Sequence, residues 1–390
     1  MLPRDTVEEY WDYDTLNKVT ELSSNNSVRY FRNEFSDYIG CEPDNLIFLN
    51  TARSGIEYIL KAKKDNAKGK YVLTCGFNCS VVQSAIENAG YTLLLFDFET
   101  ENGKVNWSQV ADMVSKDIAA IIVTHFFGVP TDFREIIKKC RQHNILIIED
   151  CAHTLGGYIG SSMAGTIGDA SVFSFNYDKP ISLAWGGAVV INDTSKINVS
   201  KLSDDEQVNS DVDRECVLDF MTRMTNRRKQ IPREGLFYFR VIKKLGFIAS
   251  SSFEIPTNKG IGPIRAELGR WCLRRYTEIL KIRNKNAETI SKLACNYSTW
   301  HVDDNVKPAW LKQKIGGVEE KQILRQASKI RRAGIRVGNY NWSTLIVGNG
   351  ADLRNALITS RKWVDIPIHQ RISEDDIKYM IDILNCSGCN

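Results

Sequence analysis

The sequence predicts an α/β fold, in which a large domain built on a mostly parallel, doubly wound sheet precedes a smaller α+β domain. Short apolar runs of strand length recur through the first half of the chain, and segments of helical length separate them. This alternation changes near residue 197, where the sequence becomes charge-rich. Apolar strands joined by helical crossovers are typical of a parallel sheet with both faces covered. The 390 residues allow two or three domains.

The strands that we expect in the sheet are short runs rich in Ile, Leu, Val and Phe. In chain order they span 45–49, 71–74, 91–96, 118–124, 145–148, 171–175 and 188–191. The helices expected between them span 54–62, 80–88, 107–115 and 132–143, and the last of these is clearly amphipathic. Gly90 follows the second helix at the position where a glycine commonly ends a helix.

The remainder of the chain has a different pattern. Residues 197–253 are mostly helical without clear strands, and a long helix with many arginines is expected near 264–293. Further helices are expected at 317–333 and 374–384, and a strand at 344–347. We therefore predict a large domain at 1–255 and a small C-terminal domain at 256–390. The arginines of the long helix, Arg265 and Arg283 among them, suit either an anionic nucleotide or solvent, and we expect them to face solvent because a charge run is usually a solvated face.

Composition excludes several classes of protein. The net charge of +4 comes from scattered basic residues, which is too little for a nucleic-acid partner. No apolar run reaches the length of a membrane span, and the first 14 residues do not resemble an export signal. The ten cysteines have no framework spacing, so we expect reduced thiols and a cytoplasmic protein. The pair Cys386–Cys389 supplies only two ligands, and we expect no metal site.

Two ionisable residues lie where an open α/β sheet binds its ligands, beyond the carboxyl ends of the strands. Asp150 closes one expected strand and Lys179 follows another. An amine and a carboxylate at such an edge suit a pyridine cofactor, because the amine forms a Schiff base with its aldehyde and the carboxylate keeps the ring nitrogen protonated. On spacing alone, a surface lysine and a helix N-cap aspartate are the simpler interpretation. Neither the GxGxxG nor the GxxxxGK[ST] motif is present, which argues against a Rossmann dehydrogenase or a P-loop NTPase.

The flanking motifs change that balance. They read EDCAHTLGG at 149–157, GTIGD at 165–169, SVFSFNYDK at 171–179 and WGG at 185–187, and they are flanked by HFFGVP at 125–130 and IPIHQRI at 366–372. This ordered set resembles the DegT/DnrJ/EryC1/StrS family of pyridoxal-phosphate-dependent sugar aminotransferases, which have the type I fold. The resemblance covers most of residues 45–195 and, more thinly, the C-terminal part.

The resemblance implies a role for each matching residue. Lys179 is expected to be the Schiff-base lysine that later carries a proton between Cα of the substrate and C4′ of the cofactor, and Asp150 to pair with the pyridine N–H. His153 matches the position beside the ring oxygen, and Ser174 matches the serine that binds the phosphate. The alternatives are a helix-start histidine bonded to backbone and a serine that faces inward on a strand. His125 and His369 are expected to be structural.

Two segments depart from the family pattern. At 51–56 the chain reads TARSGI, so Ala52 and Arg53 replace the usual Gly and Thr of the phosphate loop. A helix N-terminus there still offers N–H donors, and Arg53 either adds a charged contact or points away. In the second segment Cys79 takes the place of the aromatic residue that stacks on the pyridine ring. We interpret both changes as marks of a subgroup and keep Ala52, Arg53 and Cys79 as expected cofactor contacts.

The function implied by the resemblance is transfer of an amino group from an amino acid, with glutamate as the expected donor, to a keto-sugar. The sugar is expected to be nucleotide-linked and to serve polysaccharide or secondary-metabolite biosynthesis. Family members are homodimers with shared active sites, so the same is expected here, with neither nucleic-acid nor membrane partners. One alternative is a dehydratase acting on a deoxysugar, although Lys179 counts against it because dehydrating members carry histidine there. The other is a non-catalytic or regulatory protein with the same fold.

Overall fold

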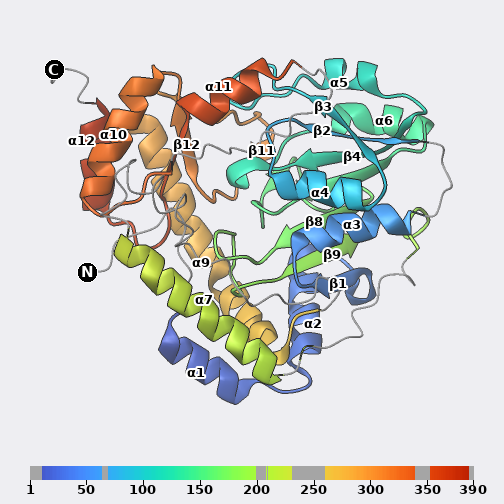
Figure 1. Cartoon of the computed structure of the whole chain (residues 1–390), viewed down its shortest axis with the longest axis horizontal. Coiled ribbons are helices and arrows are strands. Elements are labelled where there is room, and N and C mark those ends of the chain that lie inside the picture. Colours follow the sequence, from blue (N-terminus) through green and yellow to red (C-terminus); the bar gives the residue numbers. More distant parts are fainter. Residues whose placement is uncertain are drawn as a thin grey trace, which may run out of the picture.

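The computed structural model describes residues 11–63, 69–198, 208, 210–230, 260–338 and 352–385. Within these ranges the chain forms a central sheet with helices on both faces, followed by a smaller C-terminal part (Figure 1). The predicted boundary at residue 255 and the predicted strand at 344–347 lie outside the described residues. The division into two domains therefore stays a prediction.

The central sheet has seven strands in the order β1-β9-β8-β5-β4-β2-β3. Their bounds are β1 Leu46–Leu49, β2 Tyr71–Cys75, β3 Thr92–Phe96, β4 Ile118–Thr124, β5 Leu146–Asp150, β8 Ala170–Ser174 and β9 Gly187–Ile191. The pairs β2–β3, β2–β4, β4–β5 and β5–β8 are parallel, whereas β9 runs antiparallel to both of its neighbours. The prediction of a mostly parallel sheet is thus confirmed.

The two faces of the sheet are covered by different helices. Alternate residues of β9 show this, because Val189 packs in one apolar cluster and Val190 in the other. The first cluster lies under α3 Ala52–Ala62, α4 Ser80–Asn88, α5 Trp107–Met113 and α6 Arg134–Gln142. The second lies under α1 Tyr13–Leu22, α2 Ser27–Ile39, α7 Ser210–Gln230 and α9 Pro263–Leu293. Helices α1 and α2 were not expected from the sequence.

The prediction that Arg265 and Arg283 of α9 face solvent is wrong, because both side chains are fully buried. Arg265 ion-pairs with the equally buried Asp213 of α7 and donates to Asn50 Oδ1 at 3.0 Å. Arg283 donates to the Pro180 carbonyl at 3.4 Å. A charge that is paired and hydrogen-bonded can be buried without a prohibitive desolvation cost, which the sequence pattern alone did not reveal.

The C-terminal part is α+β, as predicted. Strands β10 Ser298–Thr299, β12 Gln313–Gly316 and β13 Val364–Ile366 form one small sheet. A second small sheet joins β11 Val306–Lys307 to the hairpin of β6 Tyr158–Ile159 and β7 Ser162–Met163, so it ties this part to the large domain. The helices are α10 Glu320–Arg332, α11 Arg354–Lys362 and α12 Glu374–Asn385. Among the described residues, none of the helices combines the length and apolar character needed to cross a membrane.

Candidate active site

A cavity of about 460 Å³ lies at the carboxyl edge of the central sheet. Parallel pairing places the ends of neighbouring strands side by side there, since Thr124 of β4 pairs with Asp150 of β5, and Asp150 with Val172 of β8. All of the predicted site residues line this one cavity, namely Ala52, Arg53, Cys79, Asp150, His153, Ser174 and Lys179. The structure therefore brings together residues that are up to 127 positions apart in the chain (179 − 52).

Lys179 lies in the loop after β8, and its Nζ is in contact with two polar groups. It lies 3.0 Å from His153 Nε2 and 3.3 Å from Asp178 Oδ1. Burial, followed by the nearby charge of Lys179, holds the pKa of His153 well below its usual range, so the ring is neutral. A neutral imidazole nitrogen can accept from an ammonium group or donate to a neutral amine, according to tautomer. His153 can therefore stay bonded to Lys179 in either protonation state of the amine.

Asp150 ends β5 with its carboxylate in the cavity wall and only 5% of its surface exposed. Its Oδ1 accepts a hydrogen bond from Ala152 N at 3.0 Å. Burial raises the pKa of Asp150, and the hydrogen bond and the positive charge of Lys179 offset only part of that effect. A buried carboxylate of this kind gains most from a cationic partner inside the cavity, because such a partner restores the lost solvation.

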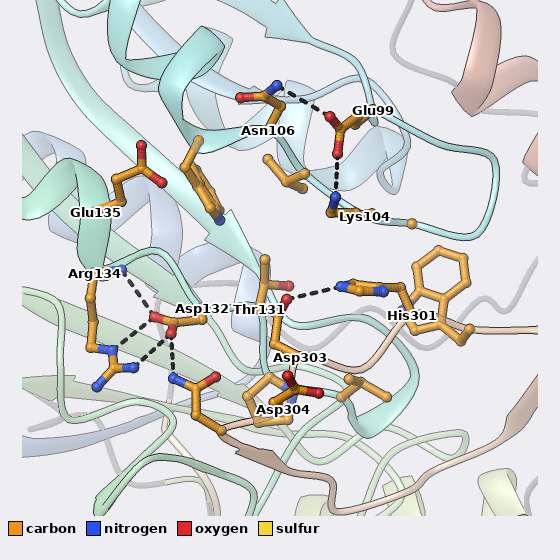
Figure 2. Close-up of a pocket in the computed structure, with 17 residues that line it drawn as sticks. Glu99, Lys104, Asn106, Thr131, Asp132, Arg134, Glu135, His301, Asp303 and Asp304 are labelled. Atoms are coloured by element: carbon orange, nitrogen blue, oxygen red, sulfur yellow. Dashed lines mark hydrogen bonds and ion pairs between the residues drawn. The ribbon is translucent and has the colours of Figure 1, made fainter.

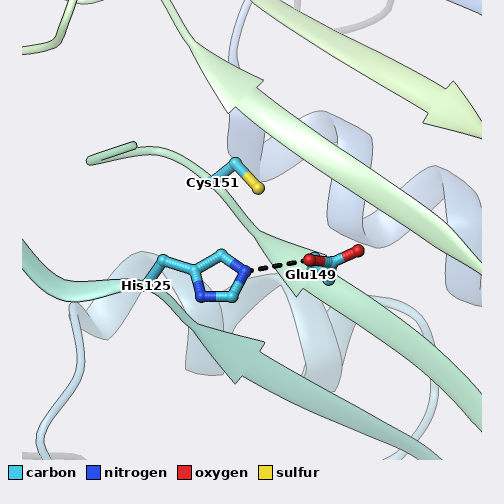
Figure 3. A group of neighbouring side chains, drawn as sticks. All are labelled: His125, Glu149 and Cys151. Carbon is cyan, nitrogen blue, oxygen red and sulfur yellow. Dashed lines mark hydrogen bonds and ion pairs between the residues drawn. The ribbon is translucent and has the colours of Figure 1, made fainter. Parts of the chain in front are cut away.

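The residues beside Asp150 are held by a buried cluster of His125, Glu149 and Cys151, drawn in Figure 3. Their possible ligand atoms lie within 4.8 Å of one another. The Glu149 carboxylate, however, is already bonded to His125 Nε2 at 3.0 Å and accepts three backbone N–H bonds from the loop at 165–168. Burial raises the pKa of Cys151 well above its ordinary value, so its thiol stays protonated.

This cluster is therefore a structural clamp, which is how the sequence analysis interpreted His125. The clamp joins the end of β5 to the GTIGD loop and explains why the two motifs occur together in the sequence. By fixing the end of β5 it also fixes the position of Asp150, which follows Glu149 directly. Asp169 of the same motif adds a bond, because its Oδ2 accepts from Ile147 N at 2.8 Å.

The N-terminus of α3 also lines this cavity. Thr51 caps the helix, with its hydroxyl accepting from Ser54 N at 3.1 Å, and Ala52 and Arg53 of the first turn line the cavity. The side chain of Arg53 is exposed. A Cβ on Gly187 would lie 2.5 Å from Ala52 N, so the glycine of the WGG motif lets β9 approach this helix N-terminus closely. Ser174, at the end of β8, lines the cavity too.

Two charged residues of the cavity wall were not predicted. Asp178 contacts Lys179, and burial alone would raise its pKa; the charges of Lys179 and Lys312 outweigh burial and keep the pKa of Asp178 below its ordinary range. Because Asp178 directly precedes Lys179 in the chain, the sequence could have predicted that it lies near the site. Lys312 comes from the C-terminal part and is 1% exposed. No motif marks it, so only the folded chain identifies it.

A larger cavity of about 800 Å³ lies elsewhere, between the loop that follows β3 and the segment 300–305. Figure 2 shows that several of its charged groups are paired with one another. Glu99 pairs with Lys104 at 2.8 Å, Asp132 with Arg134 at 2.7 Å, and His301 with Asp303 at 2.9 Å. Because none of the predicted residues lines it, we place the active site in the smaller cavity.

Comparisons with known proteins match nearly the whole chain to one family. The model of the DegT/DnrJ/EryC1/StrS aminotransferase family matches residues 6–385. A UDP-4-amino-4,6-dideoxy-N-acetyl-beta-L-altrosamine transaminase of Campylobacter jejuni is 31% identical over 196 residues, which are 49% of this chain and 51% of that protein. The aminotransferase TlmJ from Streptoalloteichus hindustanus superposes with a TM-score of 0.73 at 17% identity, covering 98% of both chains.

A GDP-4-keto-6-deoxy-D-mannose-3-dehydratase of E. coli, solved with bound hydrated pyridoxal phosphate, superposes equally well. Its TM-score is 0.73 at 16% identity, over 98% of this chain and 100% of that one. The structural matches confirm the predicted fold. The family match confirms the resemblance found in the motifs, and with it the predictions of an aminotransferase and of pyridoxal phosphate as its cofactor.

Proposed function

Because this chain belongs to the DegT/DnrJ/EryC1/StrS aminotransferase family, we propose that it transfers the amino group of glutamate to a nucleotide-linked keto-sugar, in polysaccharide or secondary-metabolite sugar biosynthesis. The observation that carries the proposal is the convergence of Asp150, His153 and Lys179 on one cavity. The transaminase from Campylobacter jejuni supports the choice of a nucleotide-linked sugar, since its printed name describes a UDP-sugar.

The residues of the cavity fit pyridoxal phosphate. A buried carboxylate, an amine and a helix N-terminus line it together, and backbone N–H groups and the helix dipole at that N-terminus favour a phosphate. When bound, the cofactor supplies an electron-withdrawing ring that stabilises negative charge at Cα of the substrate. Asp150 would hold its ring nitrogen, and Ser174 with the first turn of α3 would hold its phosphate.

Arg53 and Cys79 complete the proposed binding set. Arg53 would add a charged contact to the phosphate, which compensates for the missing threonine of the usual loop. Cys79 lines the same cavity and would pack against a face of the ring, as a small polarisable side chain can. Both roles are proposals from position.

Lys179 would hold the cofactor covalently and, once substrate displaces it, move a proton through its Nζ. That task requires the amine to be neutral when it accepts the proton and cationic when it returns it. His153 Nε2, 3.0 Å away, can follow the change by switching between acceptor and donor. Asp178 Oδ1 lies 3.3 Å from Lys179 Nζ and would stabilise the cationic form of the amine.

The assembly and the compartment are part of the same proposal. We propose a homodimer with shared active sites, which sedimentation of the purified protein tests. We also propose a cytoplasmic enzyme, and the free thiols of the eight described cysteines are compatible with a reducing compartment. Dehydration is less well supported than transamination, because Lys179 stands where the resemblance implies histidine in dehydrating members.

Absorbance spectra before and after borohydride test the function. We expect the wild-type protein to show a reducible cofactor band, and to accumulate the pyridoxamine form when glutamate is added alone. Lys179→Ala should lose the band and the reaction together, whereas Lys281→Ala, at a lysine side chain that is 68% exposed, should keep both. A wild-type spectrum without a reducible band, or unchanged chemistry in Lys179→Ala, would contradict the proposal.

A further inference from the structure

Three buried charged residues of the C-terminal part, Lys312, Lys314 and Asp365, lie behind the active-site cavity. All three side chains are at most 1% exposed. Lys314 Nζ lies 3.0 Å from Asp365 Oδ1, and Lys312 Nζ lies 3.4 Å from Asp365 Oδ2. One carboxylate thus serves two ammonium groups, and Lys312, the more distant of the two, lines the cavity.

Charged groups of both signs surround Lys179. The ammonium groups of Lys312 and Lys314 and the carboxylates of Asp178 and Asp365 lie on one side of the cavity, and the Asp150 carboxylate also lines it. A buried ammonium group is stabilised by an anion that binds beside it. Burial lowers the pKa of Lys314, and the charge of Lys312 lowers it further, against the opposing effect of Asp365.

Lys312 also lies close to the reacting amine. Its charge acts on both His153 and Asp178, which are the two groups in contact with Lys179 Nζ. The backbone holds it there, because Phe127 O accepts from Leu311 N at 2.9 Å while Phe127 N donates to His153 Nδ1 at 3.4 Å. In an amino acid the α-carboxylate is bonded to the carbon that carries the amine, so it is the anion that reaches this position.

We propose that Lys312 binds the α-carboxylate of the amino-acid donor, a role that rests on the function proposed above. The keto-sugar carries no such group, so Lys312 serves the donor half of the reaction. The diphosphate of a nucleotide-linked sugar is the other anion that this reaction would bring. We assign Lys312 to the carboxylate because Lys312 lines the same cavity as Lys179 and is only 1% exposed, which suits a small anion attached to the reacting carbon.

Binding measurements test the assignment without turnover. Calorimetry with glutarate, which keeps both carboxylates of glutamate and lacks the amine, should show binding by the wild-type protein that Lys312→Met weakens about tenfold or more. Lys307→Met is the matched control, since Lys307 is an exposed lysine of β11 outside the cavity, and it should bind glutarate as the wild type does. Equal affinities in wild type and Lys312→Met, or no binding by the wild type, would overturn the assignment.

The amine half-reaction separates the α-carboxylate from other anions. 4-Aminobutyrate has the amine and the distal carboxylate of glutamate without the α-carboxylate. Lys312→Met should raise the half-saturating concentration of glutamate about tenfold, and leave the half-saturating concentration of 4-aminobutyrate and the dissociation constant of UDP within about twofold. An equal loss of affinity for glutamate and 4-aminobutyrate, or a loss of affinity confined to UDP, would refute the role of Lys312 in binding the α-carboxylate.

A second variant guards against misfolding. Lys312→Gln removes the charge and keeps a hydrogen-bond donor toward Asp365, so it should fold and still lose the glutamate preference. If it folds and keeps that preference, the role of Lys312 fails while the reducible band and the wild-type reaction with glutamate remain. A wild-type protein that lacks the band and the reaction refutes the proposed function instead, and the glutarate measurement still decides the role of Lys312.

Discussion

Asp150 and Asp178 line the same cavity and experience opposite electrostatic environments. Burial dominates at Asp150 and raises its pKa above the ordinary 3.8, so its ionised form destabilises the folded apoprotein. Burial acts on Asp178 too, but the charges of Lys179 and Lys312 outweigh it and place the pKa below 3.8, so its ionised form stabilises the fold. The ionised Asp150 carboxylate thus stays destabilised until a cationic ligand binds beside it, whereas the Asp178 carboxylate is already paired with lysine.

We predict opposite effects of two isosteric substitutions in the apoprotein. At pH 7, Asp150→Asn should raise the thermal midpoint by roughly 2–4 °C, and Asp178→Asn should lower it by a similar amount. The Asp150 penalty appears only as pH rises past 3.8, so the Asp150→Asn difference should shrink near pH 4, whereas the Asp178 contribution is lost only as pH falls below 3.8, so the Asp178→Asn difference should persist there. Scanning fluorimetry at the two pH values measures them. Shifts of the same sign at pH 7 would contradict the assignment.

Glu149 joins the end of β5 to the loop at 165–168 through three backbone hydrogen bonds. We predict that Glu149→Gln lowers the unfolding free energy by about 3 kcal/mol, because the amide group would turn N–H donors toward N–H donors. The wild-type carboxylate accepts from Gly165, Ile167 and Gly168 at 2.7–2.8 Å. Denaturant titration measures the loss, with the exposed Glu135→Gln as control. A loss below about 1 kcal/mol would argue that the clamp is not structural.

At the scale of elements, α3 is pressed closely against the sheet. A Cβ on Gly55 would lie 2.7 Å from Val189 Cγ2 and 3.1 Å from Val172 Cγ1. We predict that Gly55→Ala destabilises the protein by about 1–3 kcal/mol, although alanine is normally the better helix former. The added methyl group would displace α3 together with its N-terminus, so the affinity for the cofactor should fall as well.

A double-substitution cycle isolates this contact. Val189→Ala removes the side chain that an added Cβ would meet, so Gly55→Ala should cost less in the Val189→Ala background than in the wild type. Thermal midpoints and cofactor titrations of the four proteins give the coupling. If the losses of stability in the two single variants add strictly in the double variant, the close approach of α3 to the sheet does not explain why position 55 is a glycine.

The sequence predicted the strands of the central sheet and the helices between them better than the elements outside that sheet. Strand β4 at 118–124 and helix α4 at 80–88 were predicted with the observed bounds, because each is a continuous apolar or periodic run. The two-residue strands β6, β7, β10 and β11 were missed, since two residues carry no periodicity. Within the site, motif residues were placed together as expected. Lys312 was missed because only tertiary packing brings it to the cavity.

At the scale of the whole molecule, the turn at residues 127–128 is one of the contacts between the central-sheet part of the chain and the C-terminal part. Gly128 O accepts from Ala309 N at 2.8 Å, and Phe127 O accepts from Leu311 N at 2.9 Å. Gly128 has φ of +92°, and a Cβ there would lie 2.1 Å from Ala309 O. A side chain at this position would therefore push apart the two walls of the active-site cavity.

We predict that Gly128→Ala raises the half-saturating glutamate concentration as well as lowering stability. Gly90→Ala is the matched control, because Gly90 has φ of +87° with nothing within 4 Å of its Cβ position, so only the backbone strain of about 1 kcal/mol is shared. Half-reaction kinetics and thermal midpoints of both variants measure the difference. Equal effects in the two variants would show that strain, rather than separation of the walls, is responsible.

The join at residues 127–128 also determines when the site can come into existence during synthesis. A ribosome releases Asp150 and Lys179 well before residue 312, so the nascent chain holds two walls of the cavity before the third has been translated. During refolding, binding of pyridoxal phosphate should therefore lag behind recovery of the circular dichroism signal of the helices. Cofactor binding would then report the docking of the C-terminal part, which completes the cavity.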